Sequence, residues 1–324
     1  MNPVKIITDG SADLPAELTA WLDADVVPLT VTFDGAPHAS SEITSPELFE
    51  SVVRTGVLPF TAAPSPWAFE TVFQHWVAQG YDVCYLGLGS GFSGAFANAR
   101  LAAQACPEGR VWLCDSGSIT SAVGLLLLKA AQLRDAGKSA EETAAALTEL
   151  ASRVRLQFTL KDMKYLRKGG RCTSLEYLVG QLMRAHPFLM LKNGAIEPIA
   201  TPKGHINRAL DELIVNFREH VQAGIDPDYL LITGSVSDES KAYLYRAAAE
   251  VFDPSHIFFV EMGAVCSCHG GPGTAGYAFL AKADQTVPSE EKQTLVPIIE
   301  AAKARLNGVL PGVILDGVRK KSEQ

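Results

Sequence analysis

Apolar and polar residues alternate along the first half of the chain with two different periods. Short apolar runs, VKIITD, DVVPLTVTF, YDVCYLGLG and VWLCD, predict strands. The longer segments between them place apolar residues three or four positions apart and predict helices. The helix predicted over ITSAVGLLLLKAAQLRDAG ends at Gly137, and Ser139 with Glu142 forms a capping box that begins the next helix. Strands that alternate with helices in this way imply a parallel sheet with helices on both faces.

The pattern changes near residue 155. There RLQFTL predicts a strand, SLEYLVGQLMRA predicts a helix with one apolar face, and PFLMLKNGAIEPIA predicts a hairpin, because Asn193-Gly194 suits a type I′ turn. Two further strands, YLLITGS and HIFFVEMG, follow with helices before and between them. We therefore expect an α/β protein with an N-terminal domain over residues 1–154 and a C-terminal α/β domain over residues 155–284. Residues 285–324 are expected to form a helical C-terminal extension.

The bulk properties narrow the classes of function. The chain has 324 residues and a formal net charge of −8, which argues against general affinity for nucleic acid or anionic membranes, since both need a basic excess. The opening MNPVKIITDG does not resemble a signal peptide, and the longest apolar stretch, SAVGLLLLKAA, is too short to span a bilayer. The six cysteines are scattered, as is typical of reduced residues that pack in a core. We expect a cytoplasmic protein.

GSGFSG at residues 89–94 is the sharpest local pattern. It matches the glycine fingerprint of a dinucleotide site, with Asp115 at the end of the next predicted strand. It is also close to the nucleophile elbow of a serine hydrolase, in which Ser93 would be the nucleophile with Asp115 and His269 as its partners. A third interpretation is a tight turn from strand to helix with Ser93 at the N-cap. The spacing alone leaves the three interpretations open.

Two further segments carry candidate chemistry. LRKGGRCTS, residues 166–174, holds Arg171 beside two glycines, where a guanidinium suits phosphate or carboxylate, although a solvated basic face explains such a run as well. CSCHGGPGT, residues 266–274, begins with the thiols of Cys266 and Cys268, which we expect on a strand that enters the site. The chain has no second pair of ligands of the kind that structural zinc sites use, so we expect no metal. The glycine-rich turn of this segment would instead fix the backbone and aim the imidazole of His269.

Six segments together resemble a known family. ITDGSADLP, TAAPSP, GSGFSGAF, CDSGSITSAVG, LRKGGR and HGGPGTAGYAF are similar, in this order, to motifs of the DegV family of bacterial fatty-acid-binding proteins. The resemblance implies a two-domain DegV-like fold, with a parallel Rossmann-like N-terminal sheet and a mixed C-terminal sheet, that buries one long-chain fatty acid between its domains. It also implies a non-catalytic lipid carrier without a cofactor. The ATP-binding subunit of a fatty acid kinase would phosphorylate the bound acid to acyl phosphate for phospholipid synthesis.

The same resemblance implies roles for individual residues. Thr61 and Ser93 would bind the carboxylate through their hydroxyls, with the helix N-terminus at Gly94 and the imidazole of His269 beside the same headgroup. SLEYLVGQLMRA and the FLML strand would be walls of the acyl tunnel, although either could equally be ordinary core. The carrier is expected to be a monomer that makes at most transient contact with a membrane.

Arg171 and Lys203 would lie at the rim of the site, where the kinase subunit docks or the new phosphate forms. Several positions depart from the family pattern. Gly10 stands in place of a serine, Ala62 and Ala63 stand in place of a Ser-Gln pair, and Lys203 stands where an arginine is usual. The alanines remove side-chain donors near the headgroup, and lysine keeps the charge without the bidentate fork of arginine.

Overall fold

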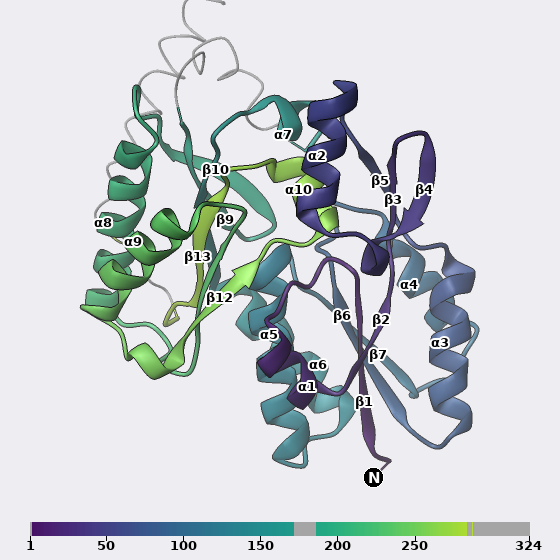
Figure 1. Ribbon diagram of the computed structural model, residues 1–324. Helices are drawn as coiled ribbons and strands as arrows, with labels where there is room; N and C mark the ends of the chain where they lie inside the picture. The colour runs from purple at the N-terminus through teal and green to yellow at the C-terminus, as the bar shows by residue number, and fades with distance from the viewer. Residues whose placement is uncertain (1, 172–185, 284–286, 288–324) are drawn as a thin grey trace, which may run out of the picture. The chain divides into compact units, whose positions relative to one another are not determined.

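The computed structural model describes residues 2–171, 186–283 and 287. Within these ranges the chain forms two main sheets with helices packed against them (Figure 1). Residues Met1–Gln285 form one compact unit, and Thr286–Gln324 make up a second. The helices predicted over SLEYLVGQLMRA and in the C-terminal extension lie outside the described residues. The predicted division at residue 154 falls at the start of a strand of the second sheet, and it stays a prediction.

The first sheet is parallel and has the strand order β2-β1-β6-β7. Its strands are β1 (Val4–Asp9), β2 (Ala24–Val27), β6 (Asp82–Gly87) and β7 (Val111–Asp115). The helices that cover its two faces are α3 (Pro66–Ala78) and α4 (Ala95–Ala103) on one side, and α5 (Thr120–Asp135) and α6 (Ala140–Arg153) on the other (Figure 1). Phe69 and Phe73 of α3 and Ala95 and Ala99 of α4 are fully buried in one cluster with this sheet. The predicted parallel sheet with helices on both faces is confirmed.

A small antiparallel sheet that the sequence analysis did not predict follows β2. Its order is β4-β3-β5, and its elements are β3 (Thr30–Phe33), β4 (Ala36–Ala39), β5 (Phe60–Ala62), the 3-10 turn η1 (Ser40–Glu42) and helix α2 (Ser45–Thr55). The prediction of a single strand over DVVPLTVTF is wrong. Pro28 divides it, because proline has no N–H with which to continue a ladder. The residues before it pair with β1, and those after it pair with β4 and β5.

The second sheet is mixed, with the order β10-β9-β8-β13-β11-β12, and only β11 and β12 are parallel neighbours. Its strands are β8 (Val154–Thr159), β9 (Phe188–Lys192), β10 (Ala195–Ala200), β11 (Leu230–Gly234), β12 (Ile257–Glu261) and β13 (Ala275–Leu280). The helices of this half are α7 (Lys164–Lys168), α8 (Asn207–Ala223), α9 (Asp238–Ala249), η3 (Pro254–His256) and α10 (Ala264–Gly270). The predicted hairpin is confirmed, with Asn193 and Gly194 at φ 52° and 75° as a type I′ turn requires.

Helix α5 packs against strands of both main sheets (Figure 1). Every residue from Thr120 to Ala131 is buried, as expected for a helix that is apolar all round. Lys129 is the one charged residue in this stretch. Its Nζ lies 2.9 Å from an oxygen of Asp226 and 2.6 Å from one of Asp228, so that the buried charge is paired. The two sheets therefore share one central helix.

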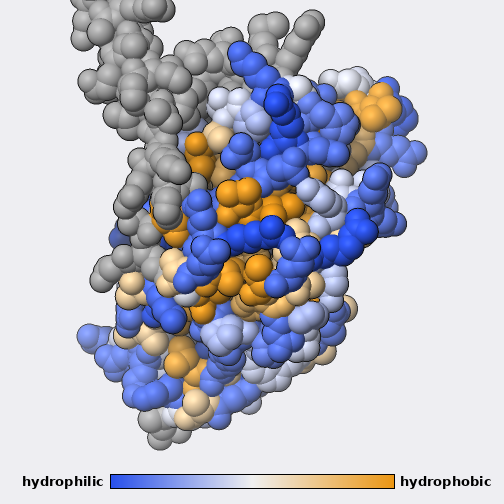
Figure 2. All heavy atoms as spheres, turned by 90° about the vertical axis from the view of Figure 1, so that its left-hand side faces the viewer, coloured by the Kyte–Doolittle hydropathy of each residue, from blue (hydrophilic) through white to orange (hydrophobic). Residues whose placement is uncertain are grey.

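The short α1 (Ala16–Leu22) lies beside α5, with Trp21 donating to Asp135. No helix within the described ranges is long and apolar enough to cross a membrane. On the face shown in Figure 2, apolar side chains gather near the middle of the surface and hydrophilic side chains surround them. The apolar run of α5 belongs to the protein core, because its residues from Thr120 to Ala131 are buried.

The tip of the β9–β10 hairpin touches the loops that follow β6 and β7. A Cβ built on Gly91 would lie 2.8 Å from the carbonyl oxygen of Gly194, and one built on Gly117 would lie 3.3 Å from the backbone nitrogen of Gly194. Contacts between backbones leave no flexible side chain that could move aside. Residue 91 can therefore carry a side chain only if the hairpin moves away from the loop.

We predict that Gly91→Ala lowers the free energy of unfolding by about 1–3 kcal/mol, the usual cost of overpacking. Urea denaturation measures this, with Gly94→Ala as the matched control, since a Cβ at Gly94 would meet no atom within 4 Å and its φ is −72°. Equal stability of the two variants would contradict the close contact with Gly194.

Candidate functional site

A cavity lies beyond the carboxyl ends of β6 and β7, where open α/β sheets commonly bind their ligands. It holds about 930 Å³ of space free of protein atoms, a volume that includes open solvent at its mouth. Its walls come from both sheets: Leu88 and Phe92 follow β6, Ile119 precedes α5, Phe158 lies in β8 and Ile196 in β10. The lining is mainly aliphatic and aromatic, so the cavity is suited to an apolar ligand.

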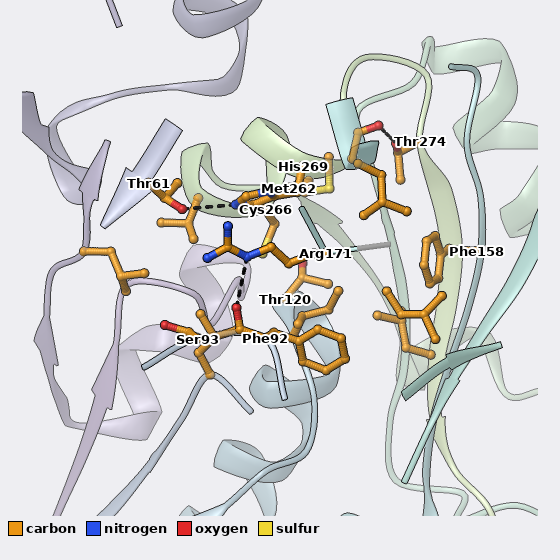
Figure 3. A pocket seen from close by; sticks show the side chains of 18 of the residues that line it. Thr61, Phe92, Ser93, Thr120, Phe158, Arg171, Met262, Cys266, His269 and Thr274 are labelled. Carbon is orange, nitrogen blue, oxygen red and sulfur yellow. Dashed lines mark hydrogen bonds between the residues drawn. The ribbon is translucent and has the colours of Figure 1, made fainter. Parts of the chain in front are cut away.

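Polar side chains gather near one end of this cavity (Figure 3). Thr61 on β5 and His269 on α10 form a hydrogen bond of 3.1 Å between Oγ1 and Nε2. Arg171 lies at the edge and is exposed, and its guanidinium donates to the carbonyl oxygens of Phe92, at 3.2 Å, and Gly169. The structure thus brings together five of the residues that the sequence analysis selected, since Ser93 and Gly94 line the same cavity.

The His269 imidazole is enclosed by protein and is neutral near neutral pH. Burial, together with the smaller effect of the positive charge of Arg171, lowers its pKa from 6.5 to about 4. A Cβ built on Gly169 would lie 2.1 Å from Nδ1 of His269, so only glycine leaves room for the ring in this position. Gly169, the first glycine of LRKGGR, therefore leaves the space that the histidine ring occupies.

Ser93 and Gly94 stand at the start of α4. The Oγ of Ser93 accepts a hydrogen bond of 3.1 Å from the N–H of Ala95, while its own proton is free to point at a ligand. Gly94 is the N-cap residue of α4 and also lines the cavity. The interpretation of GSGFSG as a strand-to-helix turn fits this geometry, with the N-cap one residue later than expected.

The carboxylates of Asp9 and Asp115 hydrogen-bond the loops that follow β6 and β7. The buried carboxylate of Asp9 accepts from the N–H of Leu88 at 2.8 Å and from the hydroxyl of Tyr85 at 2.9 Å, and burial raises its pKa. Asp115 accepts from the N–H groups of Ser90 and Gly117, both at 3.0 Å. Both carboxylates are therefore used in shaping the loops that border the cavity.

These contacts count against the two enzyme interpretations of GSGFSG. A serine hydrolase needs Ser93, His269 and Asp115 in one hydrogen-bonded chain, but in the described structure the histidine bonds Thr61 and the aspartate bonds backbone. A dinucleotide site needs open space above its glycines, whereas the carbonyl of Gly194 lies against Gly91.

The prediction that Cys266 and Cys268 lie on a strand is wrong, because both belong to helix α10. The first turn of this helix is held by Asp13, whose enclosed carboxylate accepts hydrogen bonds from the backbone of Gly263 and the thiol of Cys266. Burial raises the pKa of Asp13 to about 6. In the part of the chain that the structure describes, no group of three or more His, Cys, Asp or Glu side chains could hold a metal ion.

Two expected features are not among the residues that line the cavity. Lys203 is exposed and is not among the residues that line it. The FLML strand, which is β9, does not line it either, and Phe188 packs instead in the core with α8 and β13. On the next strand, Ile196 contributes to the wall. Alternation along β9 and β10 could not reveal which strand faces the ligand, because both are largely apolar.

The sequence analysis did not select Thr120, Thr233 or Asp13, which meet beside the cavity. Thr120 donates a hydrogen bond of 2.6 Å to Asp13, and the hydroxyls of Thr120 and Thr233 are 3.5 Å apart. Asp13 lies in ITDGSADLP and Thr120 in CDSGSITSAVG, so two of the quoted motifs contained the signal.

Comparison with known proteins shows the family to which this chain belongs. Residues 3–282 match the model of the DegV family, whose description calls its members uncharacterised proteins. A DegV domain-containing protein of Deinococcus radiodurans is 30% identical over 278 residues, which is 85% of this chain and 97% of the relative. This chain is therefore an α/β protein that belongs to the DegV family.

Two solved structures show the same fold. A DegV family protein from Thermus thermophilus, described for its fatty acid binding, has 30% identity and a TM-score of 0.80 over 87% of this chain and 100% of its own. DegV from Bacillus subtilis, described as a fatty acid binding protein, has 25% identity and a TM-score of 0.76 over the same shares. The expected DegV-like fold, with a parallel N-terminal sheet and a mixed C-terminal sheet, is confirmed.

We predict that His269 stays neutral down to about pH 4 in the lipid-free protein. Because its folded pKa lies below the unfolded value of 6.5, its contribution to stability is complete above pH 6.5 and is lost as the pH falls from 6.5 to about 4. NMR titration of the His269 ring measures the pKa, and His269→Gln removes this part of the pH dependence of unfolding. Titration near 6.5 would show that the ring is solvated.

Proposed function

We propose that this chain binds one long-chain fatty acid in the cavity, with the carboxylate at the Thr61–His269 end and the acyl chain along the apolar walls. The observation that supports this most directly is the distribution of polarity, because hydroxyls, an imidazole and a guanidinium gather near one end of a mainly apolar space. The fatty acid binding described for the relatives from Thermus thermophilus and Bacillus subtilis supports the same ligand.

Burial of the acyl chain supplies the affinity. Each methylene contributes about 0.8 kcal/mol, so a chain of about 16 carbons contributes on the order of 12 kcal/mol before the costs of association. The carboxylate is the difficult part, since an anion without partners is costly to bury. The site must therefore offer donors to the headgroup.

The polar end provides these donors without a fixed buried charge. With its proton on Nε2, His269 donates to Thr61 Oγ1, which frees the threonine proton for the ligand. Ser93 donates its proton beside it, and the N-terminus of α4 at Gly94 adds a favourable dipole. Arg171 supplies the positive charge from the edge, where solvent reaches it.

We further propose that the chain is a carrier, not an enzyme, and presents the carboxylate to a separate ATP-binding kinase subunit. There a carboxylate oxygen attacks the γ-phosphorus of ATP, acyl phosphate forms and ADP leaves. Arg171 is suited to the new phosphate because it is exposed at the edge of the cavity, and Lys203 would add charge for docking. This role fits a monomer in the cytoplasm.

Fatty acid binding predicts that protein purified from cells carries a long-chain acid, which lipid extraction and mass spectrometry detect. Ser93→Ala and Thr61→Val should each weaken binding of a long-chain acid to delipidated protein about tenfold, since each removes a hydrogen bond to a charged group. Thr71→Val is the control, because the Thr71 hydroxyl bonds the carbonyl of Trp67 on the exposed face of α3. Folded, delipidated protein that binds no long-chain acid would refute the proposal.

The carrier role predicts that two further variants affect phosphorylation of the bound acid more than fatty acid affinity. His269→Ala and Arg171→Ala should lower the rate of acyl phosphate formation by a partner kinase at least tenfold while changing fatty acid affinity less, because phosphoryl transfer depends on electrostatic positioning. His75→Ala and Lys138→Ala are matched controls at exposed positions on α3 and before α6. Unchanged phosphorylation of the His269 and Arg171 variants would remove both residues from this role.

A further inference from the structure

Thr120 and Thr233 place two hydroxyls in the cavity wall that, unlike the hydroxyl of Thr274, bond no backbone carbonyl of the described residues. Thr120 begins α5 and Thr233 lies on β11, and they are 3% and 2% exposed. Figure 3 shows Thr120 beside the side chain of Arg171, with Phe158 farther along the wall. In the described structure the hydrogen bonds of the two hydroxyls run to Asp13 and to each other, and not to Thr61, Ser93 or His269.

The hydroxyl of Thr233 has little use in the protein itself. Leu230 and Ile232 of β11 face the core shared with α8 and α9, and strand alternation turns Thr233 to the opposite side, toward the cavity. Among the described residues its only hydrogen-bond contact is the 3.5 Å approach to Thr120, which is at the limit for such a bond. Valine has the same shape and would suit a purely hydrocarbon ligand better.

Thr120 is held in place at a cost. Its φ is +49°, a conformation that is unfavourable for a β-branched residue. In this position it donates a bond of 2.6 Å to the Asp13 carboxylate, which is ionised at neutral pH because its pKa is about 6. The Cys266 thiol also interacts with this hydroxyl, so Thr120 Oγ1 keeps one lone pair for a further donor, and the bond to the carboxylate polarises it.

We propose that Thr120 and Thr233 form a subsite for a hydroxyl group carried along the acyl chain, so that the ligands of this protein include hydroxylated long-chain fatty acids. The proposal rests on the proposed fatty acid binding and adds a ligand class to it. The ligand hydroxyl accepts from Thr233 and donates to Thr120, which in turn donates to Asp13. A keto group can only accept a hydrogen bond. A keto acid would therefore make the bond from Thr233 but not the bond to Thr120.

The test compares binding of stearic acid, a series of hydroxystearic acids with the hydroxyl at different carbons, and a ketostearic acid to delipidated protein. For at least one position of the hydroxyl, the wild type should bind the hydroxystearic acid about five- to tenfold more tightly than stearic acid, which is the usual net worth of a buried hydrogen bond. Thr233→Val should abolish this preference and leave stearic acid affinity unchanged or improved, whereas Thr233→Ser should retain the preference.

Thr274→Val provides a matched control in the same cavity. The Thr274 hydroxyl already bonds the carbonyls of Gly270, at 2.8 Å, and Gly271, at 3.0 Å, so its loss should not affect the preference. The inference is overturned if stearic acid binds but no hydroxystearic acid binds more tightly, or if Thr233→Val changes both ligands equally. Failure of folded protein to bind either ligand would instead overturn the proposed function.

Discussion

The burial of α5 is the constraint on which the rest of the structure depends. An apolar helix needs protein on every side, and α5 meets this need by packing against strands of both main sheets. Its first residue, Thr120, is consequently placed where the loops after β6 and β7 meet the second sheet. The cavity forms at this meeting point, so a single helix determines both the shared core and the position of the site. The paired charge of Lys129 lets the same helix reach solvent near its other end.

Around the cavity, the carboxylates and glycines support the backbone and side chains of the site and are not its ligand-binding groups. Asp9 and Asp115 bind backbone N–H groups of the glycine loop, and Asp13 holds the first turn of α10. Glycine at residue 169 gives the imidazole of His269 its space. Acidic residues that draw attention in the sequence thus bond groups of the protein itself, and the polar end of the cavity is lined by hydroxyls, a neutral imidazole and the guanidinium of Arg171.

The sequence was sufficient for most regular elements of the two main sheets and for the residues at the polar end of the cavity. Periodicity located β1, β6, β7 and the long helices, and the family resemblance selected Thr61, Ser93 and His269 from segments far apart in the chain. Periodicity could not separate β2 from β3, because the apolar run continues through Pro28 and the change of sheet is a tertiary event. It also missed the helical state of CSCH, since the hydrogen bond from Gly263 that supports α10 ends on Asp13, about 250 residues earlier in the chain. Thr120 and Thr233 escaped notice because single threonines in apolar runs are common and only their approach in space marks them.

The shared position of α5 also affects the order in which the chain can fold. During synthesis, residues up to Arg153 can complete the parallel sheet and both layers of helices on it. The far side of α5 remains uncovered until β8, β11 and β13 have emerged, because these strands form its other contacts. A nascent or truncated N-terminal half therefore exposes an apolar helix surface, which makes it a substrate for chaperones and prone to aggregation. The two halves are joined in folding by a helix that only one of them encodes.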